Sequence, residues 1–363
     1  LNRLKWETTT EYNTGLDASF LKGKLRFTVD VYQKYIKDLL QKKVKMPTSI
    51  GYGNGYEVSY MNSGKMTNKG WEFRVDAVPF ENRDWRVGFY FNIAHNENKI
   101  TEMPDNYTEE NYTFNNGEYA YRREEGRPMG SFYGYRYKGV CQNKDATYAR
   151  DADGNVMKDI SGNAIVMRNG TATIAPGDAL YEDINHDGVI NQYDIVYLGN
   201  SNPRFTGGAG VNVSYKQFKL SAIFYGRYGQ DVVNSTRLNN ESMRGIDNQS
   251  TAVLRRWRNE GDQTDIPRAL YGEGYNTLGS DRFVEDASYL RLKSLSFNYR
   301  LPKKIIQRWG FSNIDVYVTG YNLFTWTKYT GQDPEVKTEN TYARDSATTP
   351  ASIQLVAGFN LSF

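Results

Sequence analysis

Apolar residues alternate with polar or small ones, almost without a break, through SIQLVAGFNLSF, residues 352–363, at the end of the chain. A period of two residues places the two sets on opposite faces of a β-strand. One face of this strand therefore lies against an apolar medium, which is either a protein core or lipid. The first set is Ile353, Leu355, Ala357, Phe359, Leu361 and Phe363, and the second is Ser352, Gln354, Val356, Gly358, Asn360 and Ser362.

Similar alternation recurs along the rest of the chain, and no convincing helix of normal length interrupts it. With the C-terminal segment this makes nine predicted strands, so we expect an all-β, antiparallel fold. The alternation is less regular in the seventh and eighth. The first eight are Trp6–Phe20, Leu25–Tyr35, Trp71–Ala77, Trp85–Ala94, Phe205–Tyr215, Phe218–Tyr228, Tyr289–Leu301 and Ile314–Trp326.

The connections between these segments alternate between short and long. Short turns lie near 21–24, 81–84 and 216–217, and long polar stretches near 40–64, 100–204, 231–282 and 328–350, with LPKKIIQRWGFSN after Leu301 of intermediate length. Outer-membrane barrels have short periplasmic turns and long external loops. The pattern predicts that 100–204 is a long extracellular region and that Phe363 lies on the periplasmic side.

Composition excludes several other classes of protein. The chain has a hydrophobic fraction of 39% and no run of eighteen apolar residues, which excludes a transmembrane helix. Aromatic residues reach 14%, with 29 Tyr, and such residues form girdles around membrane barrels. The net charge of +3 is scattered and indicates no nucleic-acid partner. One cysteine and two histidines exclude an internal disulfide and a His-rich or multi-cysteine metal site.

Two all-β architectures remain open at this point, a membrane barrel and a soluble sandwich or jelly roll. Strands of a dozen residues exceed the usual length in sandwiches and match the length needed to cross lipid. In a barrel the apolar faces would form one continuous outward band, whereas a soluble fold would bury them. Because a bacterial barrel closes with an even number of strands, we expect further strands before residue 1 and read the chain as a segment of a longer protein.

A series of phrases in one order carries a family resemblance. The chain resembles the C-terminal barrel half of SusC/RagA-type TonB-dependent transporters of the Bacteroidetes outer membrane, over nearly its whole length. The phrases are LNRLKWETTTEYNTGLD, VDVYQKYIKDLL, NSGKMTNKGWEFRV, GSFYGYRYKGV, DINHDGVINQYD, GNSNPRFTGG, DASYLRLKSLSFNYRLP and YVTGYNLFTWTKYTGQDPE.

The resemblance implies a transmembrane β-barrel of which residues 1–363 form about nine strands. It also implies an N-terminal plug, which these residues do not include, and import of oligosaccharides or peptides energised through TonB, ExbB and ExbD. A SusD-like surface lipoprotein would act as partner, and the N-terminal part of the same barrel would complete the sheet. Such a transporter is not an enzyme, so no catalytic residues are expected. By the same resemblance, the C-terminal Phe363 would be part of the signal that barrel assembly machinery reads.

DINHDGVINQYD, residues 183–194, matches the oxygen positions of a twelve-residue calcium loop. Gly188 takes the sixth position, where the chain turns sharply, and Asp rather than Glu takes the twelfth. We expect a structural Ca²⁺ site, or else a turn whose side chains cap their own backbone. The calcium ligands would be Asp183, Asn185, Asp187, the Val189 carbonyl, Asn191 and Asp194.

Aromatic residues in the long loops are candidates for contact with substrate or partner. They are Trp257, which stands among three arginines, and Tyr112 and Tyr119 in an aromatic stretch. Packing of the loops on themselves is the alternative role for all three. Two other functions stay open, a soluble calcium-stabilised protein that binds or hydrolyses carbohydrate and an outer-membrane adhesin without TonB dependence.

Overall fold

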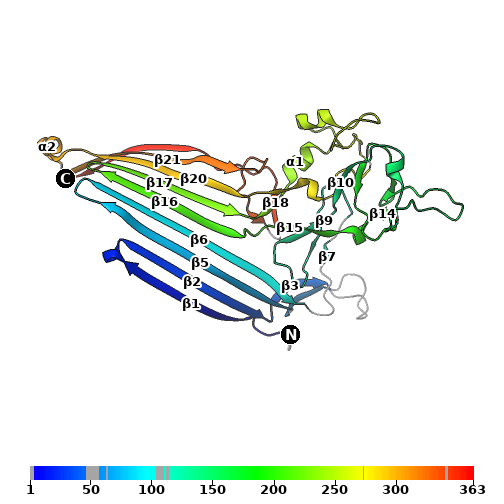
Figure 1. Ribbon diagram of the computed structural model, residues 1–363, viewed down its shortest axis with the longest axis horizontal. Coiled ribbons are helices and arrows are strands. Elements are labelled where there is room, and N and C mark those ends of the chain that lie inside the picture. The colour runs from blue at the N-terminus through cyan, green and yellow to red at the C-terminus, as the bar shows by residue number, and fades with distance from the viewer. Residues whose placement is uncertain are drawn as a thin grey trace.

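Nine long strands pair edge to edge into one sheet in the computed structural model (Figure 1). Every pairing in this sheet is antiparallel, and each strand corresponds to one of the nine segments expected from alternation. The predicted all-β, antiparallel class is confirmed. In sheet order the strands are β1 (Thr8–Phe20), β2 (Leu25–Lys37), β5 (Lys65–Glu81), β6 (Trp85–Glu102), β16 (Phe205–Tyr215), β17 (Phe218–Tyr228), β20 (Tyr289–Arg300), β21 (Asn313–Thr327) and β24 (Gln354–Ser362).

The structure describes residues 4–45, 57–62, 64–103, 110–111, 114–272, 274–339 and 342–363. Short connections lie at one end of the sheet together with the C-terminus, and the long connections lie at the other end (Figure 1). The helices are short: α1 is Ser235–Asn240 and α2 is Lys303–Ile306. Within the described ranges, no helix has both the length and the apolar character needed to cross a membrane.

The long connections fold into small sheets of their own beyond the ends of the main strands. The four largest fully buried side chains belong to this assembly: Tyr133, Tyr181, Phe132 and Phe283. The packed core therefore lies in the loops. The small sheets pair β3 (Leu40–Lys45) with β4 (Glu57–Asn62), β7 (Glu110–Asn111) with β8 (Tyr121–Arg122), β9 (Ser131–Gly134) with β15 (Val196–Asn200), and β10 (Tyr137–Val140) with β13 (Ala179–Tyr181); they also join β12 (Ala172–Thr173), β11 (Arg168–Asn169) and β14 (Val189–Ile190), and β19 (Val284–Asp286), β18 (Asp231–Asn234), β23 (Tyr342–Asp345) and β22 (Thr338–Glu339).

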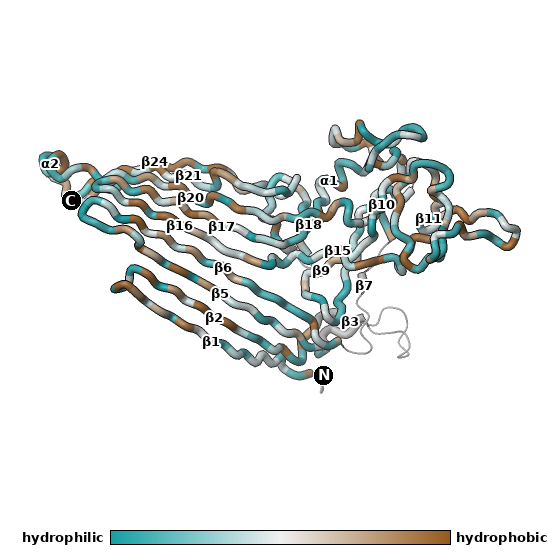
Figure 2. Tube along the Cα trace, in the orientation of Figure 1, coloured by the Kyte–Doolittle hydropathy of each residue, from teal (hydrophilic) through white to brown (hydrophobic). Residues whose placement is uncertain are grey.

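One face of the main sheet is an apolar band that stays exposed. A single line of paired residues crosses all nine strands on this face, and every member is apolar or glycine. Apolar positions recur in the same way along the length of the strands (Figure 2). Large members at the edge of the band are open to the surroundings, with Leu355 75% and Phe359 67% exposed. The line is Phe20, Leu25, Ala77, Phe89, Val211, Ala222, Leu295, Gly320 and Leu355.

Irregular pairing in β20 and β21 explains why alternation was less regular there. The register of β20 shifts between Leu292 and Ser294. The shift occurs both in the pairing with β17, where Ile223 and Phe224 lie opposite, and in the pairing with β21. A bulge of this kind inserts a residue and moves the apolar positions from even to odd numbers. Lys293 is the inserted residue, and its ammonium group donates to the Glu335 carboxylate at 2.9 Å.

Candidate functional site

The face of the main sheet opposite the apolar band carries polar and tyrosine side chains. Glu72, Arg74 and Asp76 alternate with apolar residues along β5 and lie on this face. Arg74 donates to both oxygens of the Asp76 carboxylate, at 2.7 and 2.8 Å, and its guanidinium carbon lies 5.5 Å from the centre of the Tyr90 ring. Such bidentate pairs are among the stronger hydrogen-bonded contacts of a polar surface. This face can therefore line an aqueous interior.

A buried arginine joins the polar face to the long connection that follows β21. Arg291 is only 2% exposed. Its guanidinium group donates to Asp333 at 2.5 Å, to Glu335 at 2.8 Å and to the Thr325 hydroxyl at 2.8 Å. Burial raises the pKa of Asp333, but hydrogen bonds from the Ala351 and Glu335 amides and from Arg291 outweigh it and bring that pKa below its usual value. Asp333, Glu335 and the Ala351 amide are thus held against the wall of the sheet by charge.

A second group of charges lies inside the loop assembly. Glu241 is shared by two arginines, with Arg237 Nε at 3.0 Å and Arg282 Nη2 at 2.9 Å. Arg237 also pairs with Glu285 at 3.2 Å. Nε and Nη1 of Arg282 are buried without a hydrogen-bond partner. Because a buried charge is tolerated when it is paired, this group fixes α1 relative to β19.

A polar cavity of about 480 Å³ opens beside these charges, between α1, the segment that follows β21 and the end of β23. Arg237, Glu241, Arg255 and Asp345 line it, together with amide and hydroxyl side chains such as Asn240. A cavity with charges of both signs and several amides can hydrogen-bond a polar ligand such as a peptide or a sugar.

The structure gives packing roles to two of the three predicted contact residues. Tyr119 is 6% exposed, and its hydroxyl donates to the Ser280 carbonyl at 2.7 Å. Burial raises the pKa of Tyr119 far above its usual value. Trp257 packs on Gly177, where an added Cβ would come within 2.3 Å of the indole ring. Tyr112 lies outside the described residues, and a contact with substrate or partner stays a prediction for these side chains.

The predicted calcium loop is closed by hydrogen bonds to its own backbone. Asp183 accepts from the amides of Asp187 at 3.2 Å and Gly188 at 2.7 Å, and Asp187 accepts from the Val189 amide at 2.7 Å. Gly188 has a φ of +81°, as the tight turn at the sixth position requires. These contacts are those of the alternative interpretation, a turn that caps itself.

Asp194, at the twelfth position of the loop, is fully buried. Its carboxylate accepts from the amides of Ile184 and Asn191, each at 2.8 Å. Burial raises the pKa of Asp194 despite these hydrogen bonds. In the part of the chain that the structure describes, no group of three or more His, Cys, Asp or Glu side chains is arranged to hold a metal ion. Calcium binding by Asp183, Asn185, Asp187, Val189, Asn191 and Asp194 stays a prediction.

The buried ion pairs of Arg291 and Arg282 were not found from the sequence. Arg291 meets Asp333 and Glu335 across more than forty positions of the chain, and Arg282 meets Glu241 across 41. No local spacing reveals such pairs. The one available signal is that Arg291 sits within an alternating strand at a position where the polar face continues.

Comparison with known proteins supports the family resemblance that the sequence phrases indicate. Residues 2–323 match the family model described as TonB dependent receptor-like, beta-barrel. The chain is 32% identical to TonB-dependent receptor P3 of Formosa agariphila, in a match that covers 93% of this chain and 32% of that protein. It is 27% identical to TonB-dependent receptor SusC of Bacteroides thetaiotaomicron, in a match that covers 99% of this chain and 32% of that protein. The solved structure of the RagAB peptide transporter matches with a TM-score of 0.71 and 27% identity, over 99% of this chain and 36% of that one. The chain thus spans about a third of the length of these relatives.

Proposed function

The chain belongs to the TonB-dependent receptor β-barrel family, in its SusC/RagA group, and on this premise we propose that it forms part of an outer-membrane importer. The proposed cargo is a peptide or an oligosaccharide, taken up actively with energy delivered through TonB, ExbB and ExbD. The importer performs no covalent chemistry on its cargo in this proposal.

The observation that carries the proposal is the exposed apolar band together with the placement of the connections. In the described residues the band crosses all nine strands, and the packed cores lie in the loops instead of beneath the sheet. Lipid is the medium that suits such a band, because a soluble protein would cover it. The polar face then turns toward the interior of the barrel, where a plug and water would meet it.

A surface lipoprotein of the SusD type is the proposed partner on the side of the long connections. The loop assembly there has its own packed cores and buried ion pairs, such as Arg282 with Glu241. A rigid surface of this kind suits docking better than loose loops do. The polar cavity beside Arg255 and Asp345 is the proposed place for cargo on this side.

We also propose that the loop 183–194 binds Ca²⁺ and stiffens this assembly. Asp194 supports it, because its buried carboxylate forms no ion pair with any cationic side chain among the described residues. A carboxylate has about four acceptor sites, so amide contacts leave room for a cation.

The test is to purify the complete protein from its native membrane in mild detergent and to identify every polypeptide and small molecule that accompanies it by mass spectrometry. The proposal predicts a lipoprotein partner and bound peptides or oligosaccharides. Recovery of a water-soluble protein that needs no detergent would contradict it and would favour the soluble carbohydrate-binding alternative.

A further inference from the structure

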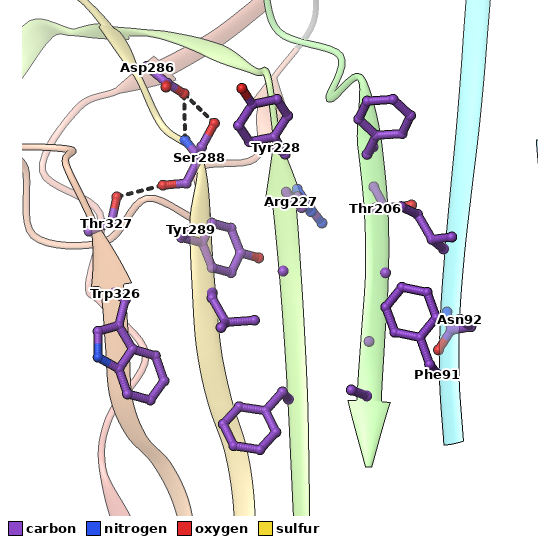
Figure 3. A pocket seen from close by; sticks show the side chains of 18 of the residues that line it. Phe91, Asn92, Thr206, Arg227, Tyr228, Asp286, Ser288, Tyr289, Trp326 and Thr327 are labelled. Atoms are coloured by element: carbon purple, nitrogen blue, oxygen red, sulfur yellow. Dashed lines mark hydrogen bonds between the residues drawn. The ribbon is translucent and has the colours of Figure 1, made fainter. Parts of the chain in front are cut away.

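A hollow interrupts the apolar band near the end of the sheet that carries the long connections. Its volume is about 660 Å³, and it lies over β6, β16, β17, β20 and β21. Figure 3 shows it from close by, with Trp326 at one side, Phe91 at the other and Tyr228 toward the end that carries Asp286 and Ser288. The register explains the hollow, because two adjacent strands place glycine at neighbouring outward positions: the line across it is Ile93, Gly207, Gly226, Leu290 and Trp326.

The floor of the hollow is fixed by how closely the strands approach there. A Cβ on Gly207 would lie 2.4 Å from the Asn92 carbonyl oxygen, and one on Gly226 would lie 2.7 Å from that of Tyr289. Neither backbone atom can move aside cheaply, so these positions require glycine. In the next row Ala209 lies between Phe91 and Phe224, which extends the small-residue floor between aromatic walls.

The outer end of the hollow is polar. Asp286, Ser288, Thr327 and Lys328 line it. The Ser288 amide donates to Asp286 at 2.8 Å and its hydroxyl donates to the same carboxylate, while the Thr327 hydroxyl donates to the Ser288 carbonyl at 2.8 Å. The Asp286 carboxylate is therefore hydrogen-bonded within the chain and keeps its charge. Lys328 is exposed and, within the described part of the chain, takes part in no ion pair, so its ammonium group is open to an anionic ligand.

We propose that the hollow binds one acyl chain of an anionic membrane lipid, with the phosphate of its head group beside Lys328. The inference rests on the proposed location in the outer membrane. The apolar floor with a polar, cationic end matches the two parts of such a lipid. Tyr228 and Trp326 mark the boundary, because aromatic residues with a polar atom gather where lipid tails meet head groups.

The two small side chains Ala209 and Ala222 provide a matched test. Both are alanines on the apolar face, paired with neighbouring strands in the same way, but only Ala209 lines the hollow. Ala209→Leu fills the floor, and Ala222→Leu adds the same atoms elsewhere on the band. Lys328→Gln removes the charge without changing the floor.

The experiment places the complete protein in lipid nanodiscs of phosphatidylglycerol and phosphatidylcholine in equal parts and counts the lipids retained after release, by native mass spectrometry. We expect the parent protein and Ala222→Leu to retain one phosphatidylglycerol more than Ala209→Leu does. We expect Lys328→Gln to retain the two lipids without preference.

Equal retention by Ala209→Leu and Ala222→Leu would overturn the proposal, as would a second protein copy seated on the band in place of lipid. Uptake of cargo, measured on the same variants, separates this inference from the proposed function. If Ala209→Leu retains its lipid while uptake is normal, only the lipid site is wrong. If no variant enters the nanodisc, the membrane location itself fails.

Discussion

Arginine at the middle of the apolar band should destabilise the barrel far more than arginine one residue away. Ala222 lies near the centre of β17 and pairs with Val211 and Leu295 on the band, whereas Ile223 pairs with Gly210 and Ser294 on the polar face. The two residues are adjacent in the chain and differ in the side they face. They therefore form a matched pair for testing which side meets lipid.

The size of the difference follows from the two environments. An arginine facing lipid near the midplane costs about 2–4 kcal/mol, which lowers the folding equilibrium constant roughly 30- to 700-fold. Ile223 is already 40% exposed on the polar face, so Ile223→Arg should change stability by only about 0.5 kcal/mol, as exposed substitutions usually do.

The assay is urea-induced unfolding of the complete protein in lipid vesicles, followed by tryptophan fluorescence. We expect the midpoint for Ala222→Arg to fall clearly below that of the parent protein and the midpoint for Ile223→Arg to stay close to it. Equal losses for the two variants, or a larger loss for Ile223→Arg, would refute the assignment of the faces.

Five further outcomes are expected from the loop assembly and its attachment to the main sheet. Arg291→Leu should weaken the attachment of Asp333 by on the order of 2 kcal/mol, because this half-buried carboxylate loses its cation whereas Glu335 keeps Lys293, and should speed hydrogen exchange of the Glu335 and Ala351 amides, which donate to Asp333. The pKa of Asp333 is lower in the folded state than in the unfolded state. Its contribution to the free energy of unfolding is therefore complete above the unfolded-state pKa and should be lost as the pH falls through the folded-state pKa. Burial raises the pKa of Asp231 in the folded state. The free energy of unfolding should therefore fall as the pH rises from the unfolded-state pKa of Asp231 through its folded-state pKa. Asp231→Asn should remove this slope when the melting temperature is measured against pH. Burial raises the pKa of Cys141 to about 11, so iodoacetamide at pH 7.5 should label it only after unfolding. Ca²⁺ should raise the melting temperature of the parent protein, and Asp187→Ala should abolish that rise.

Four of these expectations have a result that would contradict them. Unchanged exchange of the Glu335 and Ala351 amides in Arg291→Leu would show that the ion pair does not hold these residues. An Asp231→Asn variant with an unaltered pH slope would assign the slope to another group. Rapid labelling of Cys141 in the folded protein would mean that the loop core opens readily. A rise in melting temperature with Ca²⁺ that persists in Asp187→Ala would place calcium binding outside the loop 183–194.

The main sheet was predictable because lipid or a core forces alternation on every strand that touches it. The same reasoning explains the errors in strand length. β6 runs on to Glu102, well beyond the predicted end at Ala94. Its outer part, which includes Asn96 and Lys99, has no apolar face. A strand that extends beyond the apolar medium is surrounded by water on both faces, so alternation is not required there. At the other edge, β1 begins at Thr8 and leaves Trp6 outside the strand, 91% exposed.

The loop assembly could not be predicted in the same way. Its strands are two to six residues long and pair across long separations, as β9 does with β15. Periodicity carries no information over so short a length. The hollow in the band also escaped notice, because Gly207 and Gly226 read as ordinary glycines until the register placed them side by side.

The central claim, that this chain is part of an energised importer, is tested most directly by uptake in living cells. Labelled peptides and labelled oligosaccharides would be supplied to cells with the gene, without it, and with it after the proton gradient is collapsed by a protonophore. We predict uptake of one of the two cargo classes only in energised cells that carry the gene. Equal uptake of both classes in all three conditions would contradict the account.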